Sequence, residues 1–102
     1  MKKIINGKMY NTETAEYIGR FDNGLPHNDF NYYREEFYRK RTGEFFVCGE
    51  GGPASPYCKY LDDGWRGYGY DIVPLELYEA KEWAEKYLSA DRYVELFGEV
   101  EE

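Results

Sequence analysis

Residues 32–48 contain the pattern that most constrains what this chain can fold into. Aromatic and charged side chains are mixed over residues 32–40, and residues 41–43 (Arg-Thr-Gly) are typical of a turn. Residues 44–48 (Glu-Phe-Phe-Val-Cys) are rich in the aromatic and β-branched residues that favour strands. Two such segments joined by a short turn predict an antiparallel β-hairpin.

The first 31 residues predict a second hairpin, a short helix and a loop. Asn6-Gly7 separates two short apolar segments, and this dipeptide tolerates the positive φ of a two-residue hairpin turn. Residues 11–19 predict a short helix, because Asn11 or Thr12 can cap its start and Gly19 can end it. Residues 20–31 are rich in Asn, Asp, Gly and Pro, which predicts an exposed loop.

The second half of the chain predicts a loop, one more strand and two helices. Residues 49–56 are a loop by composition, and residues 70–73 predict an edge strand closed by Pro74. Residues 75–88 have the period of an amphipathic helix. Asp91 can cap a second helix that ends at Gly98. The face of the longer helix predicted to be buried holds Leu77, Ala80, Trp83, Ala84, Tyr87 and Leu88.

This order of elements predicts one α+β domain covering residues 1–102. A small antiparallel sheet of two hairpins and a possible edge strand is expected, with the short N-terminal helix and the two C-terminal helices on one side. The chain has 12 Tyr, 6 Phe and 2 Trp, which indicates many half-buried positions around a thin core.

The net charge of −7 is confined to the last third of the chain. Residues 1–70 contain ten acids and ten bases, whereas residues 71–102 contain ten acids and three bases. Such a local negative field repels nucleic acid and anionic lipid and attracts basic surfaces. We therefore expect no direct nucleic-acid binding and no membrane binding, and a protein partner with a basic surface. The sequence leaves open whether the protein is a monomer or a homodimer.

Cysteine usage and hydropathy predict a cytoplasmic protein. The chain has two cysteines, Cys48 and Cys58, and Met1-Lys2-Lys3 is not followed by the apolar segment of a signal peptide. No apolar run approaches the length that spans a membrane. Both thiols are expected to be reduced.

The residue patterns of common catalytic and metal sites are missing from the sequence, and we predict a protein that is not an enzyme. The segment 49–52 (Gly-Glu-Gly-Gly) resembles a phosphate loop, but Glu50 would repel an anion and no Gly-Lys-Ser follows. A tight strand exit with positive-φ glycines is the structural alternative. His27 is the single histidine, so a zinc site would lack ligands. We predict no catalytic residues, no metal and no cofactor.

The acidic face of the C-terminal helices is the candidate binding site. Carboxylates three or four residues apart on a helix are neighbours, and Tyr78 lies among them on the polar face. The alternative interpretation is an ordinary solvated helix surface. The predicted partner-binding residues are Glu76, Tyr78, Glu79, Glu82, Glu85, Asp91 and Glu95.

Residues spread over nearly the whole chain resemble small uncharacterised proteins carried by phages and mobile elements of Gram-positive bacteria. The segment Gly49-Glu50-Gly51-Gly52-Pro53-x-Ser55 is the most recognisable part. This family tends to start the long helix with Ser, where this chain has Glu76, which implies a weaker N-cap. The other matching residues are Asn6-Gly7-Lys8, Tyr10, Thr12, Thr14-Ala15, Tyr38-Arg39, Thr42-Gly43, Phe45-Phe46, Tyr57, Trp65, Pro74-Leu75, Ala80 and Glu82-Trp83-Ala84-Glu85.

The resemblance names no activity, but small acidic proteins of mobile elements include anti-restriction and anti-CRISPR inhibitors that occupy nucleic-acid sites of host proteins. By this analogy the first functional hypothesis is an inhibitor or modulator that mimics DNA on a basic host protein. The alternative hypothesis is an accessory or self-associating domain whose aromatic residues contact a protein partner.

Overall fold

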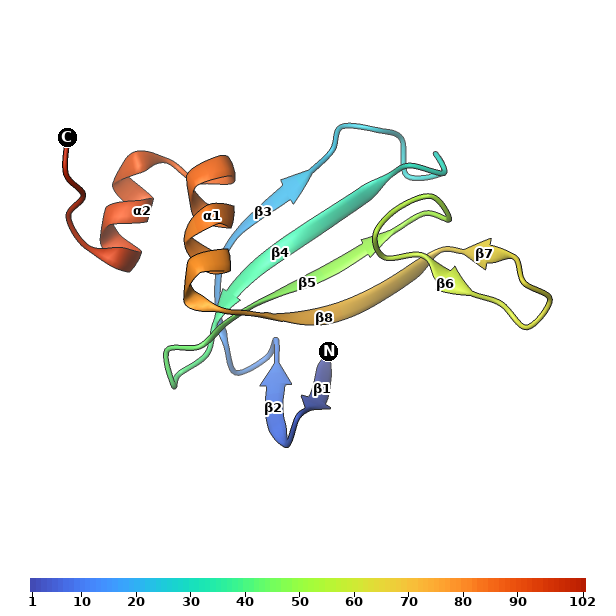
Figure 1. Ribbon diagram of the computed structural model, residues 1–102, viewed down its shortest axis with the longest axis horizontal. Coiled ribbons are helices and arrows are strands. Elements are labelled where there is room, and N and C mark those ends of the chain that lie inside the picture. The colour runs from blue at the N-terminus through green and yellow to red at the C-terminus, as the bar shows by residue number, and fades with distance from the viewer.

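A four-stranded antiparallel sheet forms the centre of the computed structural model, which describes all 102 residues. Its strands are β3 (Glu16–Asp22), β4 (Tyr33–Arg39), β5 (Phe45–Gly51) and β8 (Gly69–Leu75), in the order β3-β4-β5-β8 (Figure 1). Two separate hairpins join β1 (Lys2–Ile5) to β2 (Lys8–Asn11) and β6 (Lys59–Tyr60) to β7 (Arg66–Gly67). The helices α1 (Leu77–Tyr87) and α2 (Ala90–Phe97) follow the last strand. The predicted α+β class with antiparallel sheets and two C-terminal helices is confirmed.

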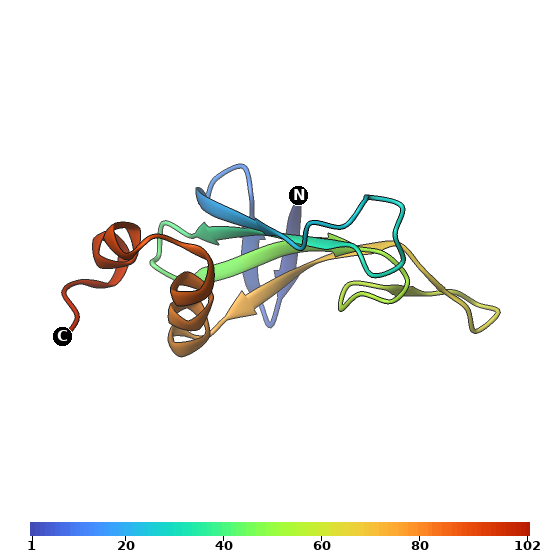
Figure 2. The ribbon, with the colours of Figure 1, turned by 90° about the horizontal axis from the view of Figure 1, so that it is seen from above.

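The two helices cover one face of the sheet at one end of the molecule (Figures 1 and 2). Phe37 of β4 is fully buried there, and its ring stacks on Phe45 at 5.3 Å and on Trp83 of α1 at 4.6 Å between ring centroids. Ala80 and Ala84 let α1 lie close to the strands. Leu77, predicted to face the core, is instead 56% exposed, because it is the first residue of the helix.

The opposite face of the same sheet is covered by the N-terminal hairpin. Tyr10 of β2 meets the buried Phe46 edge to face, and Tyr38 stacks on Phe46. The turn of this hairpin has positive φ at both Asn6 (51°) and Gly7 (78°), as the Asn-Gly pair predicts. The sheet is therefore a thin layer between two aromatic clusters.

The predicted helix over residues 11–19 is wrong. Asn11 does not cap a helix: its side-chain oxygen accepts a hydrogen bond from the N–H of Glu13, and its carbonyl accepts from Thr14 and Ala15. These bonds close a turn, which is the other structure that Asn favours. The chain then continues as β3, and Gly19 lies within that strand, where an added Cβ would lie 2.8 Å from a methyl group of Leu88.

Three strands continue past the predicted boundaries, because strand pairing continues further than the composition of these segments indicates. The predicted loop 20–31 begins only after Asp22, where β3 ends. The predicted loop 49–56 begins after Gly51, because β5 pairs with both neighbours as far as that residue. Pro74 does not close β8 but lies inside it, as an edge strand allows.

The glycines of the Gly49-Glu50-Gly51-Gly52 segment are needed for space and not for positive φ, which none of them has. A Cβ on Gly49 would overlap the ring of Tyr57, and one on Gly51 would overlap the side chain of Ser55. A Cβ on Gly52 would lie 2.6 Å from the carbonyl oxygen of Phe30. The segment is a packing motif that holds residues 52–57 against the sheet, so the predicted positive-φ strand exit is wrong.

Alkaline conditions should destabilise the fold, because burial raises the pKa of Tyr38 to about 12. An unfolded tyrosine titrates near 10, so the stability that this residue contributes is complete below about pH 10 and is lost as the pH rises to about 12. Two pKa units correspond to about 3 kcal/mol. Denaturant unfolding measured across this range, with the tyrosinate absorbance recorded in parallel, checks the loss.

Tyr38→Phe is the matched control for this titration, because no hydrogen bond to the Tyr38 hydroxyl is present and the stacking on Phe46 would remain. We expect this variant to lose less stability between about pH 10 and about pH 12 than the wild type. A variant that loses as much stability as the wild type would contradict this account.

Candidate functional site

The predicted acidic site lies on α1, α2 and the residue before α1, at one end of the molecule. Helix α1 starts after Glu76, whose backbone N–H donates to the Glu79 carboxylate at 2.9 Å. This contact satisfies one of the backbone donors that a helix start leaves free. Glu79 also places negative charge near the positive end of the helix dipole, which offsets the absence of a Ser cap.

The polar face of α1 carries Tyr78, Glu82 and Glu85, as the helical period predicts. Ala80, Trp83 and Ala84 are buried against the sheet, so residues on the opposite side of the helix face solvent. Tyr78 is 65% exposed, and Glu82 and Glu85 are exposed beside it. The aromatic ring therefore lies on the surface among carboxylates.

Helix α2 contributes less to this face than predicted. Its N-cap is Ser89, which accepts a hydrogen bond from the Arg92 N–H at 3.1 Å, and not Asp91. Asp91 is exposed in the first turn. Glu95 forms an ion pair with Arg92 at 2.7 Å, so its charge is partly neutralised within the helix. Of the seven predicted site residues, Glu95 alone has an internal ion pair.

More carboxylates form ion pairs in residues 1–70 than in residues 71–102. In residues 1–70, Glu16, Asp22, Glu36, Glu44 and Glu50 are held in ion pairs. In residues 71–102, ion pairs are limited to Asp71, with Lys3, and Glu95. The charges left without an ion pair belong to Glu76, Glu79, Glu82, Glu85, Asp91, Glu99, Glu101 and Glu102. Apart from Glu79, which is half-buried and accepts the Glu76 N–H, these carboxylates are exposed and available to a partner.

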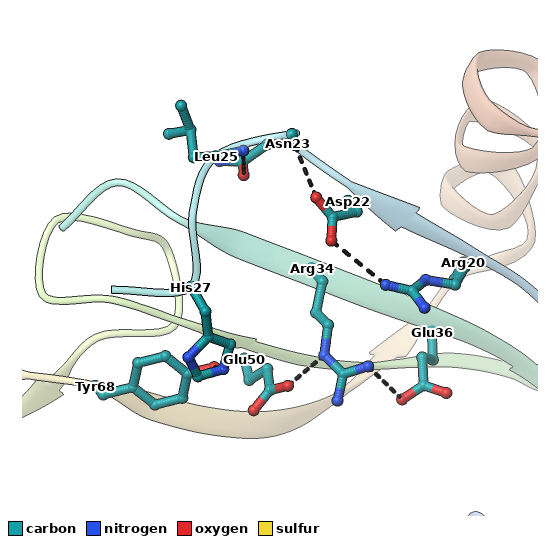
Figure 3. Close-up of polar contacts among 10 residues, drawn as sticks. Arg20, Asp22, Asn23, Leu25, His27, Arg34, Glu36, Glu50 and Tyr68 are labelled. Carbon is teal, nitrogen blue, oxygen red and sulfur yellow. Dashed lines mark hydrogen bonds and ion pairs between the residues drawn. The ribbon is translucent and has the colours of Figure 1, made fainter. Parts of the chain in front are cut away.

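Sequence analysis missed a ladder of charged side chains on the face of the sheet that carries the N-terminal hairpin. The strand register sets Asp22, Arg34 and Glu50 side by side on β3, β4 and β5. The Arg34 guanidinium lies between Glu50 and Glu36, and Arg20 pairs with Asp22 (Figure 3). Because positive and negative side chains alternate across the strands, this face largely neutralises itself.

One end of the ladder is joined to the loop between β3 and β4. The Tyr68 hydroxyl lies 2.9 Å from His27 Nε2, and the two rings lie close together (Figure 3). Burial, and then a hydrogen bond with Glu50, raise the pKa of Tyr68 to about 12. His27 is thus part of a contact that fixes the loop to the sheet. No group of three or more His, Cys, Asp or Glu side chains could hold a metal ion.

A second feature that sequence analysis missed is a cluster of exposed aromatic residues at the opposite end of the molecule. The hairpin of β6 and β7, here called the arm (residues 59–67), projects from the sheet there (Figure 1). The Asp63-Gly64 turn between aromatic residues is the signal that could have predicted it. The exposed side chains are Tyr60 (74%), Trp65 (72%), Tyr70 (68%), Leu61 (44%) and Tyr68 (37%).

Comparison with models of protein families, with curated proteins and with solved structures finds no match to this chain. Neither helix is long and apolar enough to cross a membrane.

Proposed function

We propose that this protein is a non-enzymatic inhibitor or modulator that occupies a basic, nucleic-acid-binding surface of another protein. The observation that carries the proposal is the set of exposed carboxylates without ion pairs on α1 and α2, namely Glu82, Glu85 and Asp91. Five of the ten carboxylates in residues 1–70 form ion pairs, against two of the ten in residues 71–102, so this acidity is not a uniform property of the surface. The resemblance to phage and mobile-element proteins favours a partner among host defence nucleases.

The spacing of the carboxylates supports the comparison with nucleic acid. Glu82 and Glu85 are exposed on the polar face of α1, and their separation of three residues is a rise of about 4.5 Å along the helix axis. One strand of duplex DNA carries one phosphate per about 3.4 Å of its axis. A groove lined with Lys and Arg for phosphates would therefore meet a similar density of charge on α1. The exposed ring of Tyr78 adds an apolar surface beside these two carboxylates.

The test is a Glu82→Lys/Glu85→Lys variant, assayed for binding to purified restriction and CRISPR nucleases and for inhibition of their DNA cleavage. Both residues are exposed and free of ion pairs, and the new Lys–Lys neighbours at 81/85 and 82/86 should cost only about 0.2–0.5 kcal/mol each, so the fold should be retained. We expect affinity for the inhibited nuclease to fall ten- to hundredfold, about 1.4–2.8 kcal/mol. Wild-type binding should weaken as salt is raised, and DNA should compete with it.

Glu99→Lys/Glu101→Lys is the matched control, because it changes the net charge equally but lies after α2. We expect this variant to bind within about threefold of the wild type, since charge outside the contact acts mainly through screened long-range attraction. Equal effects of the two variants would attribute binding to overall charge. If the affinity for the nuclease changes neither on charge reversal in α1 nor with salt concentration, the proposed site is excluded.

A further inference from the structure

Four aromatic residues of the arm and of the segment that follows it, as far as the start of β8, are exposed: Tyr60, Trp65, Tyr68 and Tyr70. Multiplied by side-chain areas of roughly 200 Å² each, the exposed fractions of Tyr60, Trp65, Tyr68 and Tyr70 amount to roughly 500 Å². The largest apolar patch on a typical monomer is about 300–600 Å² and is often functional. A stable interface buries about 800 Å² per partner. These four residues alone supply roughly three-fifths of that area.

The same end of the molecule offers both a projection and a recess. The projection is the tip of the arm, where Leu61 and Trp65 are joined by a backbone hydrogen bond of 2.8 Å. The recess lies between the base of the arm and β8 and has a volume of about 560 Å³. Its lining is mixed: Tyr68, Tyr70 and Val73 contribute apolar surface, and Lys3, Lys59 and Asp71 contribute charged groups. A two-fold symmetric interface requires such self-complementarity, because each copy must offer the same patch to the other.

The charges of the arm are also self-complementary. Lys59 and Arg66 lie on its two strands, in adjacent register pairs, and neither forms an ion pair. Asp62 lies in the turn of the arm, is exposed and has no ion pair. The same patch therefore carries free charges of both signs. Two copies related by a two-fold axis can pair the cations of one arm with the acid of the other.

Repulsion between the acidic C-terminal ends of two copies does not prevent contact between their arms. The molecule is 50 Å long, and Figures 1 and 2 show the helices at one end and the arm at the other. The Debye length at physiological salt is about 8 Å, so repulsion between the two acidic ends would be screened in an arm-to-arm pair. Contact at any surface near α1 or α2 would instead bring like charges together.

We propose that two copies of this chain form a two-fold symmetric dimer through the arm, with each arm tip in the recess of the other copy. The dimer buries Trp65 and leaves the two acidic faces free at its far ends. This inference does not depend on the proposed function, since it needs no third molecule.

Sedimentation and light scattering of the full chain over a wide concentration range test the proposal. We expect a species of twice the 12.1 kDa chain mass at high concentration, and a blue shift of the Trp65 emission as it forms. Trp65→Ala should weaken the dimer at least tenfold while leaving the circular dichroism and the Trp83 emission unchanged. Leu77→Ala, at an exposed apolar position at the acidic end, should not weaken it. A chain that stays monomeric, or a dimer indifferent to Trp65→Ala, would overturn the proposal.

A charge exchange tests the two-fold geometry in particular. Lys59→Glu/Arg66→Glu and Asp62→Lys should each weaken the homodimer by placing like charges opposite one another. An equimolar mixture of the two variants should regain dimer, because every contact between the different chains then joins opposite charges. Failure of the mixture to associate better than either variant alone would rule out the reciprocal arm contact.

Discussion

Replacement of Gly49 by alanine is expected to destabilise the folded protein by about 3–5 kcal/mol. The ring of Tyr57 lies directly on Gly49, and an added methyl group would overlap it. Overpacking in a well-packed core costs about 1–3 kcal/mol and occasionally more. Displacing Tyr57 would also break its hydrogen bond to Glu35, worth a further 1–3 kcal/mol or so if the carboxylate is left unpaired.

Gly67→Ala is the matched control for this prediction. Gly67 is also a strand glycine without positive φ, but a Cβ there would lie 3.7 Å from Leu61, in ordinary contact. We expect Gly67→Ala to change the free energy of unfolding by less than about 1 kcal/mol. Urea unfolding of both variants, followed by the emission of buried Trp83, measures the difference. Equal effects would mean that Gly49 is not constrained by Tyr57.

Gly49 also shows why the sequence analysis of its segment was incomplete. Three glycines in four residues indicate a loop by composition, and the usual reason for such glycines is positive φ. In the structure Gly49 and Gly51 continue β5, and their lack of a side chain makes space for Tyr57 and Ser55. Which ring lies on which glycine depends on tertiary packing, and no local pattern in one sequence reports it.

Elements defined by local signals were predicted, and those defined by long-range contacts were not. Asn6-Gly7 determines its own turn, and the helical period of residues 75–88 determines which side of α1 is buried. Asn11 favours a turn as well as a helix cap, and pairing of the following residues with β4 decides between them. The predicted N-terminal helix failed for this reason.

At the candidate sites as well, residues defined by local signals were predicted and residues brought together by long-range contacts were not. The exposure of Tyr78, Glu82 and Glu85 follows from the helical period alone, and the structure places them as predicted. The alternating charges of Asp22, Arg34 and Glu50 become neighbours only through the register of three strands. The exposure of Trp65 likewise depends on the arm leaving the sheet: Asp63-Gly64 indicates a hairpin, but not that this hairpin projects away from the other strands.

Replacement of Glu35 by alanine is expected to destabilise the fold by about 2–4 kcal/mol. The two carboxylate oxygens of Glu35, on β4, accept hydrogen bonds from the Tyr57 hydroxyl and from Trp83 Nε1, the latter at 3.0 Å. This one side chain therefore joins the sheet to α1 and to the segment that leads into the arm. Alanine would leave two donors without a partner in a partly buried site, at about 1–2 kcal/mol each.

Glu35→Gln distinguishes the hydrogen bonds from the charge. The amide oxygen can accept from Trp83 Nε1, and the amide N–H can donate to the Tyr57 oxygen, so we expect a loss of about 1 kcal/mol or less. A double-mutant cycle of Glu35→Ala with Tyr57→Phe should show a coupling of about 1 kcal/mol, because either change breaks the same bond. Equal losses for the alanine and glutamine variants, or additive effects in the cycle, would contradict a structural role for this contact. In this role, Glu35 connects α1 to the base of the arm through its hydrogen bonds and not through its charge.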